Sequence, residues 1–276
     1  MTIPFEFFSL PSQRSTTKPR KSGLTMVMDW GMSVAEQEDW LSVSAPYVDL
    51  IKVVVGTARL YDETTLSEKL RAYKEQRILT FVGGMFLEYV LHEQGLDGAE
   101  RYIHEARRLG FEAVEISDNL VPFSEDQRIN LIRMVCESDM MAIAEVGSKS
   151  TKSSAADLII QIDTCLEFGA EIVLVEAAEL FSSGEPDTKK CEELSTYSHL
   201  AKVMFELGGP WIPGTTTHSV FALRLFLIQK FGADVNLANV MPELLLDTEA
   251  TRVGLGDPLE DLRLLAERSA FCFADQ

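Results

Sequence analysis

The sequence predicts a single (β/α)8 barrel of the TIM type with a short N-terminal extension. Apolar segments rich in β-branched residues recur about every thirty residues, roughly the length of one βα unit, and eight such units close a barrel. Several of these segments end in a carboxylate or a lysine. The predicted strands are Leu24–Asp29, Asp49–Val55, Ile78–Gly83, Phe111–Ser117, Met141–Gly147, Glu171–Ala177, Lys202–Leu207 and Asp234–Val240.

Helix-like stretches separate these strands and carry start and stop signals. Ser124 precedes the stretch Ile129–Cys136, whose apolar residues recur at helical spacing, as expected behind a serine N-cap. The stretch Leu158–Leu166 is followed by Gly169, and Gly110 closes an earlier one. Glycine is a common C-terminal stop, so strand and helix alternate as a barrel requires.

The chain divides into an N-terminal arm, residues 1 to about 22, and a barrel domain, residues 23–276. We expect the arm to pack loosely on the barrel or on a neighbouring subunit, with its basic run Arg14–Lys21 solvated. Two segments have the composition of long active-site loops, Phe181–Asp187 and Gly208–His218.

Composition excludes several classes of protein. The formal net charge of −18 disfavours nucleic acid and anionic membranes as partners, because both bind through basic patches. No apolar run approaches the roughly 20 residues that cross a bilayer, and Met1–Phe8 lacks the basic start of a signal peptide. We expect a cytoplasmic homo-oligomer that binds a small anionic substrate.

Cysteine spacing gives no sign of a zinc ribbon or a disulfide framework, because no Cys-x-x-Cys pair occurs. Reduced thiols are expected at Cys136, Cys165, Cys191 and Cys272.

The polar ends of the predicted strands are the strongest functional signal. A charge in an apolar run is expensive to bury without a partner, a metal or a polar pocket. The carboxyl ends of barrel strands meet at the face where such enzymes keep their chemistry. The predicted acidic ring consists of Asp29, Glu115, Glu145, Glu176 and Glu206, with Lys52 and Lys149 as its cations.

Carboxylate oxygens without histidine or cysteine favour a hard cation, Mg²⁺ first and Mn²⁺ next. Such an ion would hold a substrate carboxylate and stabilise an enediolate-like charge on it. A lysine beside carboxylates is a usual general acid or base. The alternative is that some of these carboxylates only pair with Lys52 or with backbone amides.

A weaker signal is the hydroxyl-rich segment Thr215, Thr216 and Thr217, followed by His218. Hydroxyls and amides at a helix N-terminus can seat an anion, and ordinary helix capping explains the same residues equally well. The sequence contains no P-loop, dinucleotide fingerprint or Gly-x-Ser-x-Gly elbow, so nucleotide and esterase chemistry have no support.

From about residue 20 to 260 the chain resembles the phosphosulfolactate synthase family. The runs that carry the resemblance are Gly23–Asp29, Tyr47–Lys52 with Gly56 and Thr57, Gly83–Tyr89, Leu109–Asp118, Glu145–Lys149 and Phe231–Asn239. The resemblance implies a barrel enzyme that uses Mg²⁺ to add sulfite to phosphoenolpyruvate, a first step toward coenzyme M.

The resemblance also implies roles for individual residues. Lys149 matches the lysine of the family's Glu-Val-Gly-x-Lys motif and would be the acid, while Lys52 would help to bind the anions. We place Glu115 with these lysines in catalysis. Ser117 and Asn239 lie in matching runs and are expected to contact the substrate, together with Lys52, Thr215, Thr216, Thr217 and His218.

Three departures from the family pattern concern the substrate. Trp30 stands where the family has a basic residue, and Ala178 replaces an arginine that would be a natural phosphate clamp. The loop after the seventh predicted strand is longer and carries Trp211 and His218. Either Thr215–Thr217 binds the phosphate, or the ligand has none. The alternatives are therefore a divergent lyase for a related sulfonate or carboxylate, and a non-catalytic paralogue like the plant proteins associated with heat stress.

Overall fold

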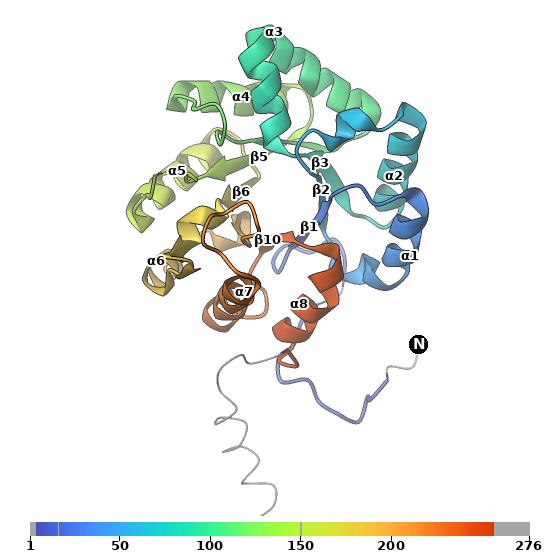
Figure 1. Ribbon diagram of the computed structural model, residues 1–276, viewed down its shortest axis with the longest axis vertical. Helices are drawn as coiled ribbons and strands as arrows, with labels where there is room; N and C mark the ends of the chain where they lie inside the picture. Colours follow the sequence, from blue (N-terminus) through green and yellow to red (C-terminus); the bar gives the residue numbers. More distant parts are fainter. Residues whose placement is uncertain (1–3, 16, 150, 257–276) are drawn as a thin grey trace, which may run out of the picture.

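A computed structural model describes residues 4–15, 17–149 and 151–256. Eight parallel strands form a closed barrel in the order β1-β10-β9-β6-β5-β4-β3-β2 (Figure 1). The fold class predicted from the sequence is therefore confirmed. The strands are β1 (Thr25–Asp29), β2 (Leu50–Val53), β3 (Leu79–Val82), β4 (Ala113–Ile116), β5 (Met141–Val146), β6 (Ile172–Val175), β9 (Val203–Glu206) and β10 (Leu237–Val240).

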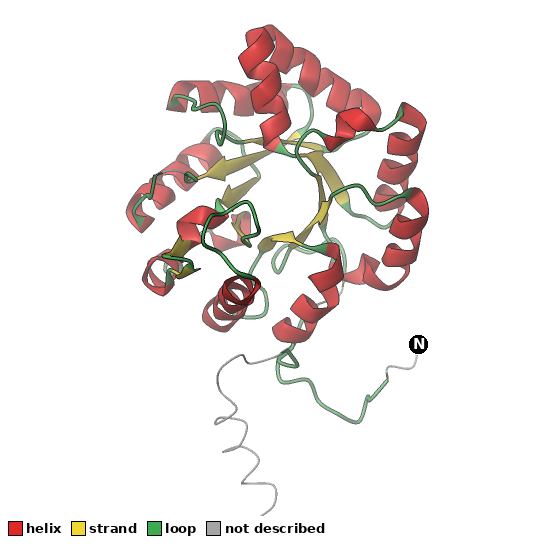
Figure 2. Ribbon diagram, viewed as in Figure 1, coloured by secondary structure: helices red, strands yellow, loops and turns green. Residues whose placement is uncertain are grey.

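Helices surround the barrel on its outer side (Figure 2). They are α1 (Val34–Ser44), α2 (Glu63–Glu75), α3 (Gly84–Leu109), α4 (Glu125–Glu137), α5 (Ala155–Glu167), α6 (Thr188–Leu194), α7 (Thr217–Phe231) and α8 (Leu245–Arg252). Four of them begin with a reciprocal capping box, whose N-cap residues are Ser33, Ser124, Ser154 and Thr216. These boxes satisfy amides that the first helical turn would leave unpaired. None of the described helices is long and apolar enough to cross a membrane.

Short elements complete the loops. Within the described residues there are five 3-10 helices, η1 (Ala45–Tyr47), η2 (Thr57–Leu60), η3 (Ala177–Leu180), η4 (Leu200–Lys202) and η5 (Pro242–Leu244). Strands β7 (Phe181–Ser182) and β8 (Glu185–Pro186) pair antiparallel, so the predicted loop Phe181–Asp187 is a small hairpin. Helix α3 bends at Gly95, whose φ of 66° is left-handed, a conformation that favours glycine.

The core has two layers, because successive strand residues point to opposite sides of the barrel. Val114 and Ile116 of β4 pack outward beneath the helices, as predicted. The inner layer plugs the barrel and contains Met26, Leu50, Phe81, Ala113, Ile143, Ile172, Leu174, Met204 and Ala238. Any inward residue two positions further along a strand therefore lies above this apolar plug, at the carboxyl end of the barrel.

The N-terminal arm contacts the amino ends of β1 and β2, where Arg14 donates to Thr25 and Arg20 donates to Asp49, and it passes beside α8 (Figure 1). The side chains of Arg14 and Arg20 are only 2% exposed. Arg20 makes two hydrogen bonds to Asp49, at 2.8 and 2.9 Å, and Lys18 donates to the carbonyl of Ala45 at 2.8 Å. The expectation of a solvated basic run is therefore wrong for Arg14 and Arg20, because the buried carboxylates of Glu249 and Asp49 bind them. Lys21 is exposed, as expected, and so are most of residues 4–13.

Candidate active site

Three glutamates meet at the carboxyl ends of separate strands. Glu115 of β4, Glu145 of β5 and Glu206 of β9 are buried, and each contributes a carboxylate oxygen to a group whose atoms lie within 4.8 Å of one another. Each follows an inner-core residue by two positions, so strand alternation directs all three into the barrel above the apolar plug. We call them the glutamate triad.

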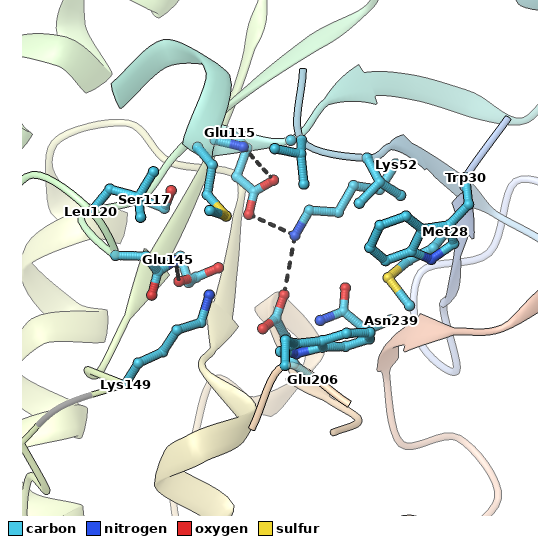
Figure 3. Close-up of a pocket in the computed structure, with 17 residues that line it drawn as sticks. Met28, Trp30, Lys52, Glu115, Ser117, Leu120, Glu145, Lys149, Glu206 and Asn239 are labelled. Atoms are coloured by element: carbon cyan, nitrogen blue, oxygen red, sulfur yellow. Dashed lines mark hydrogen bonds and ion pairs between the residues drawn. The ribbon is translucent and has the colours of Figure 1, made fainter. Parts of the chain in front are cut away.

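Lys52 of β2 lies inside the same group (Figure 3). Its Nζ atom is 2.8 Å from Glu115 Oε1 and 3.3 Å from Glu206 Oε1. Burial lowers the pKa of this ammonium, but the charges of the surrounding glutamates outweigh burial and raise the pKa above its ordinary value. Lys52 therefore stays charged and neutralises only part of the glutamate triad.

The excess of negative charge affects the pKa values of the glutamates. Burial, and then the charges of Glu206, Glu176 and Glu115, raise the pKa of Glu145 well above its ordinary value. Burial also raises the pKa of Glu206 to about 7, against the opposing effect of Lys52. Three carboxylates against one ammonium leave the site short of positive charge. Three oxygen ligands without nitrogen or sulfur suit a hard divalent cation, so the glutamate triad could hold such an ion.

Asp29 does not join the glutamate triad. Its Oδ2 atom lies 2.9 Å from Lys69 Nζ and accepts a 2.9 Å hydrogen bond from Tyr73, both on α2. Its Oδ1 atom accepts from the amides of Gly31 and Met32. Asp29 is thus fully occupied in fixing the loop after β1, and this arrangement does not support the metal-binding role predicted for it.

Glu176 occupies an intermediate position. It caps η3, where Oε1 accepts a 3.0 Å hydrogen bond from the Ala178 amide. Its buried Oε2 atom has no hydrogen-bond partner and lies 3.7 Å from Lys149 Nζ. Glu176 therefore pairs with the predicted acid rather than with the glutamate triad.

A cavity of about 300 Å³ opens above the glutamate triad. It brings together many of the residues predicted from the sequence, and Figure 3 shows Lys149 extending toward Glu145 from the side opposite Lys52. The predicted site residues that line the cavity are Lys52, Glu115, Ser117, Glu145, Lys149, Glu206 and Asn239, joined by Met28, Trp30, Val54, Val55, Gly83, Gly84, Met85, Asn119, Leu120 and Trp211.

Asn239 reaches this cavity through an irregular strand. Two positions separate Thr25 from Val27 in β1, whereas three separate their partners Leu237 and Val240 in β10. The extra residue is a bulge, a device that redirects side chains beside active sites. Asn239 has a φ of 58°, and its buried Oδ1 atom lacks a hydrogen-bond partner. A buried acceptor without a partner is costly, so this atom is available to a ligand.

The hydroxyl-rich segment does not reach the cavity. Thr216 is the N-cap of α7 and accepts a hydrogen bond from the Ser219 amide. Thr215 donates to backbone carbonyls of its own loop. Thr216, Thr217 and His218 are exposed, and none of the four predicted residues lines the cavity. Helix capping accounts for the threonines, and the predicted substrate contacts here gain no support.

Two buried glutamates that the sequence analysis missed hold the loops around the cavity. Glu179 accepts hydrogen bonds from the amides of Ser148 and Ser153, which flank Lys149. Glu88 of α3 accepts from the Ser117 hydroxyl and from two amides of the loop after β4. A charged residue within an apolar segment was the signal that could have found both glutamates. Strand alternation does not show where the side chains of residues on helices and loops point.

Magnesium is expected to stabilise the protein more strongly as pH rises from 5 to 8. A raised carboxyl pKa means that the metal-free folded state binds more protons than the unfolded state between the ordinary value of 4.5 and about 7 for Glu206. The free energy of unfolding of the metal-free protein therefore falls as pH rises through that window. A cation that replaces those protons restores the lost stability.

Thermal unfolding with Mg²⁺ and with EDTA across this pH range measures the effect. The control is Glu112→Gln, which removes a carboxylate just outside β4 and should keep the magnesium-dependent increase. A magnesium effect that does not change with pH would contradict the prediction.

The chain is similar over most of its length to proteins of one family. Residues 13–257 match the family described as (2R)-phospho-3-sulfolactate synthase (ComA). Phosphosulfolactate synthase of Methanothermobacter thermautotrophicus is 33% identical over 266 residues, which cover 94% of this chain and 99% of that protein. Protein HEAT-STRESS-ASSOCIATED 32 of Arabidopsis thaliana is 23% identical and covers 80% and 82%, respectively.

A solved structure supports the fold alone. The carboxyl transferase domain of Rhizobium etli pyruvate carboxylase, variant Y628A with pyruvate, aligns with a TM-score of 0.57 and 13% identity, over 92% of this chain and 47% of that longer one. The family match spans nearly the whole barrel and the first relative exceeds 30% identity. The chain therefore belongs to the phosphosulfolactate synthase family, a family of carbon–sulfur bond-forming enzymes.

Proposed function

We propose that this protein catalyses the Mg²⁺-dependent addition of sulfite to an α,β-unsaturated carboxylate, with phosphoenolpyruvate as the leading substrate and phosphosulfolactate as the product. The observation that carries the proposal is the glutamate triad, which lies with Lys52 and Lys149 in one cavity and has more negative than positive charge. Glu115, Glu145 and Glu206 would hold Mg²⁺, with Mn²⁺ as the alternative. The bound ion would stabilise negative charge on the substrate carboxylate.

The lysines have distinct tasks in this reaction. Lys52 is fixed by Glu115 and Glu206 and presents a permanent positive charge to the bound anions. Lys149 is more accessible, with 33% of its side chain exposed, and can approach a bound substrate. Ser117 and Asn239 supply polar contacts on the cavity wall.

The proposed step balances in atoms and electrons. The sulfur lone pair of sulfite attacks the methylene carbon and forms the carbon–sulfur bond. The π electrons of the double bond move onto the carboxylate as an enediolate. The Lys149 ammonium then gives a proton to the carbon next to the carboxylate, and solvent returns a proton to the lysine.

The direct test is incubation of the purified protein with Mg²⁺, sulfite and phosphoenolpyruvate. Phosphosulfolactate should form, detected by mass spectrometry, and EDTA should stop its formation. In D₂O the product should carry one deuterium on the carbon that bears the phosphate. Failure to form product from this pair would reject phosphoenolpyruvate as the substrate.

A second candidate is the same addition to a related carboxylate without a phosphate. The observation that favours it is the absence of arginine from the described cavity lining, together with the presence of Trp30 and Trp211. Arginine is the usual bidentate partner of phosphate.

A further inference from the structure

Glu145 is held differently from the other two members of the glutamate triad. Glu115 and Glu206 both pair with Lys52, at 2.8 and 3.3 Å. Within the described residues no ion pair reaches Glu145, and its one hydrogen bond comes from the side chain of Asn119, which donates to Oε1 at 2.6 Å. The direction in which this carboxylate points therefore depends on Asn119, a residue of the cavity wall.

The amide of Asn119 is a neutral donor, and this suits a carboxylate that is to bind a cation. An ammonium or guanidinium group in the same place would also hold Glu145, but its charge would repel a divalent ion. A neutral amide orients the carboxylate and leaves its negative charge in place. Carboxylates that bind metals are commonly oriented by hydrogen bonds of this kind.

The loop that carries Asn119 is held by a buried carboxylate. Asn119 lies between β4 and α4. Glu88 of α3 accepts hydrogen bonds from the Ser117 hydroxyl and from the Leu120 amide, on either side of Asn119 in the chain. These contacts fix the backbone from which the Asn119 side chain reaches Glu145.

Glu88 is 0% exposed and makes no ion pair among the described residues. Burial of a carboxylate without a counter-ion is costly unless hydrogen bonds compensate it, and in this protein the loop after β4 supplies those hydrogen bonds. A second contact holds the same loop from α4, where Arg128 pairs with Asp118 at 2.6 Å. The position of Asn119 is therefore preformed before any ligand binds.

We infer that Asn119 is a positioning residue of the metal site, which directs the Glu145 carboxylate toward the divalent cation from a loop that Glu88 holds in place. This inference rests on the proposed function and adds the groups that orient one of its metal ligands. Mg²⁺ demands near-ideal octahedral geometry, whereas Ca²⁺ accepts flexible coordination. A correctly directed Glu145 therefore favours Mg²⁺ over Ca²⁺.

Isothermal titration of the metal-free protein with Mg²⁺ and with Ca²⁺ tests this role without turnover. Asn119→Ala should weaken Mg²⁺ binding by about 10- to 100-fold, the usual effect of removing a group that orients a metal ligand. Ca²⁺ binding should stay within about threefold, because its coordination tolerates a misdirected carboxylate. The ratio of the two affinities distinguishes positioning from general damage to the site.

A pair of Glu88 variants tests the support of the loop. Glu88→Gln keeps an oxygen for the Leu120 amide and a polar group beside the Ser117 hydroxyl, so Mg²⁺ affinity should stay within about threefold of the wild type. Glu88→Ala removes both contacts and should weaken Mg²⁺ binding about as much as Asn119→Ala does. Equal Mg²⁺ affinity of the two Glu88 variants would remove Glu88 from this role.

Asn130→Ala is the matched control. Asn130 is exposed on α4, where its side chain donates to Met134 Sδ, so its replacement should leave both affinities unchanged. Wild-type Mg²⁺ affinity in Asn119→Ala, equal weakening of Mg²⁺ and Ca²⁺, or the same loss in Asn130→Ala would overturn the inference. Failure of the proposed function is a separate result, namely no phosphosulfolactate from the magnesium-loaded wild type although the variants differ in Mg²⁺ affinity as expected.

Discussion

Replacement of Lys149 by alanine is expected to lower kcat about 10²- to 10⁴-fold, the range that a positioned general acid contributes. The Lys149 side chain lines the cavity on the side opposite Lys52, and the proposed reaction needs one proton on the carbon next to the carboxylate. Alanine leaves that carbon to be protonated by water. Steady-state kinetics with Mg²⁺, sulfite and phosphoenolpyruvate measure the loss.

A neighbouring lysine provides the control. Lys152 lies on the same loop, but its Nζ atom donates to the Phe181 carbonyl at 2.9 Å and its side chain does not line the cavity. Lys152→Ala should therefore keep kcat within about threefold of the wild type, as expected for a residue outside the reacting groups. The affinity for Mg²⁺ should not fall in Lys149→Ala, because the glutamate triad is intact and the site has lost a neighbouring positive charge. Wild-type turnover in Lys149→Ala would remove this lysine from the mechanism.

The place of Lys149 depends on a residue from the next βα unit. Glu179 accepts hydrogen bonds from the amides of Ser148 and Ser153, which lie before and after Lys149 in the chain. Its Oε2 atom also pairs with Lys190 Nζ at 2.8 Å. Glu179 is therefore a positioning residue. Its effect reaches the chemistry only through the loop that carries Lys149.

The barrel and the glutamate triad could be predicted because both follow from local periodicity. Strand alternation alone puts Glu115 on the same face as Ala113 and Lys52 on the same face as Leu50, and both apolar residues belong to the inner core. The carboxyl ends of parallel strands in a closed barrel converge whatever the loops do.

The same alternation explains why Asp29 lies elsewhere. Met26 belongs to the inner core, so Val27 and Asp29 face outward, toward the helices. Lys69 on α2 reaches Asp29 from 40 residues further along the chain. The outward direction of Asp29 could be predicted from strand alternation. Its partner lysine could not, because the sequence of α2 does not show which side of the helix faces β1.

Contacts that join distant segments could not be predicted at all. Arg14 pairs with Glu249, 235 residues away, and no local pattern carries that information. The prediction that Thr215–His218 contacts the substrate gains no support for a different reason. Hydroxyl-rich helix starts serve capping and anion binding with the same residues, and only the position of the cavity separates the two.

Arg20→Ala is expected to lower the free energy of unfolding by about 3–5 kcal/mol, the usual result of removing one partner of a buried ion pair. Arg20 is 2% exposed in its side chain and Asp49 is 7% exposed, and the two make paired hydrogen bonds. Without the guanidinium, Asp49 keeps one hydrogen bond, from the Thr25 amide at 3.0 Å. A buried carboxylate at the amino end of β2 would then lack its counter-ion.

Chemical denaturation of wild type, Arg20→Ala and Lys21→Ala at pH 7 measures this loss. Lys21 is the adjacent basic residue and is exposed, so its removal should change stability by less than about 0.5 kcal/mol. The double variant Arg20→Ala with Asp49→Asn separates the pair from general damage to the arm. If the ion pair carries the effect, neutralising Asp49 should recover part of the stability lost in Arg20→Ala. Equal stability of the Arg20 and Lys21 variants would show that the ion pair between Arg20 and Asp49 does not stabilise the fold.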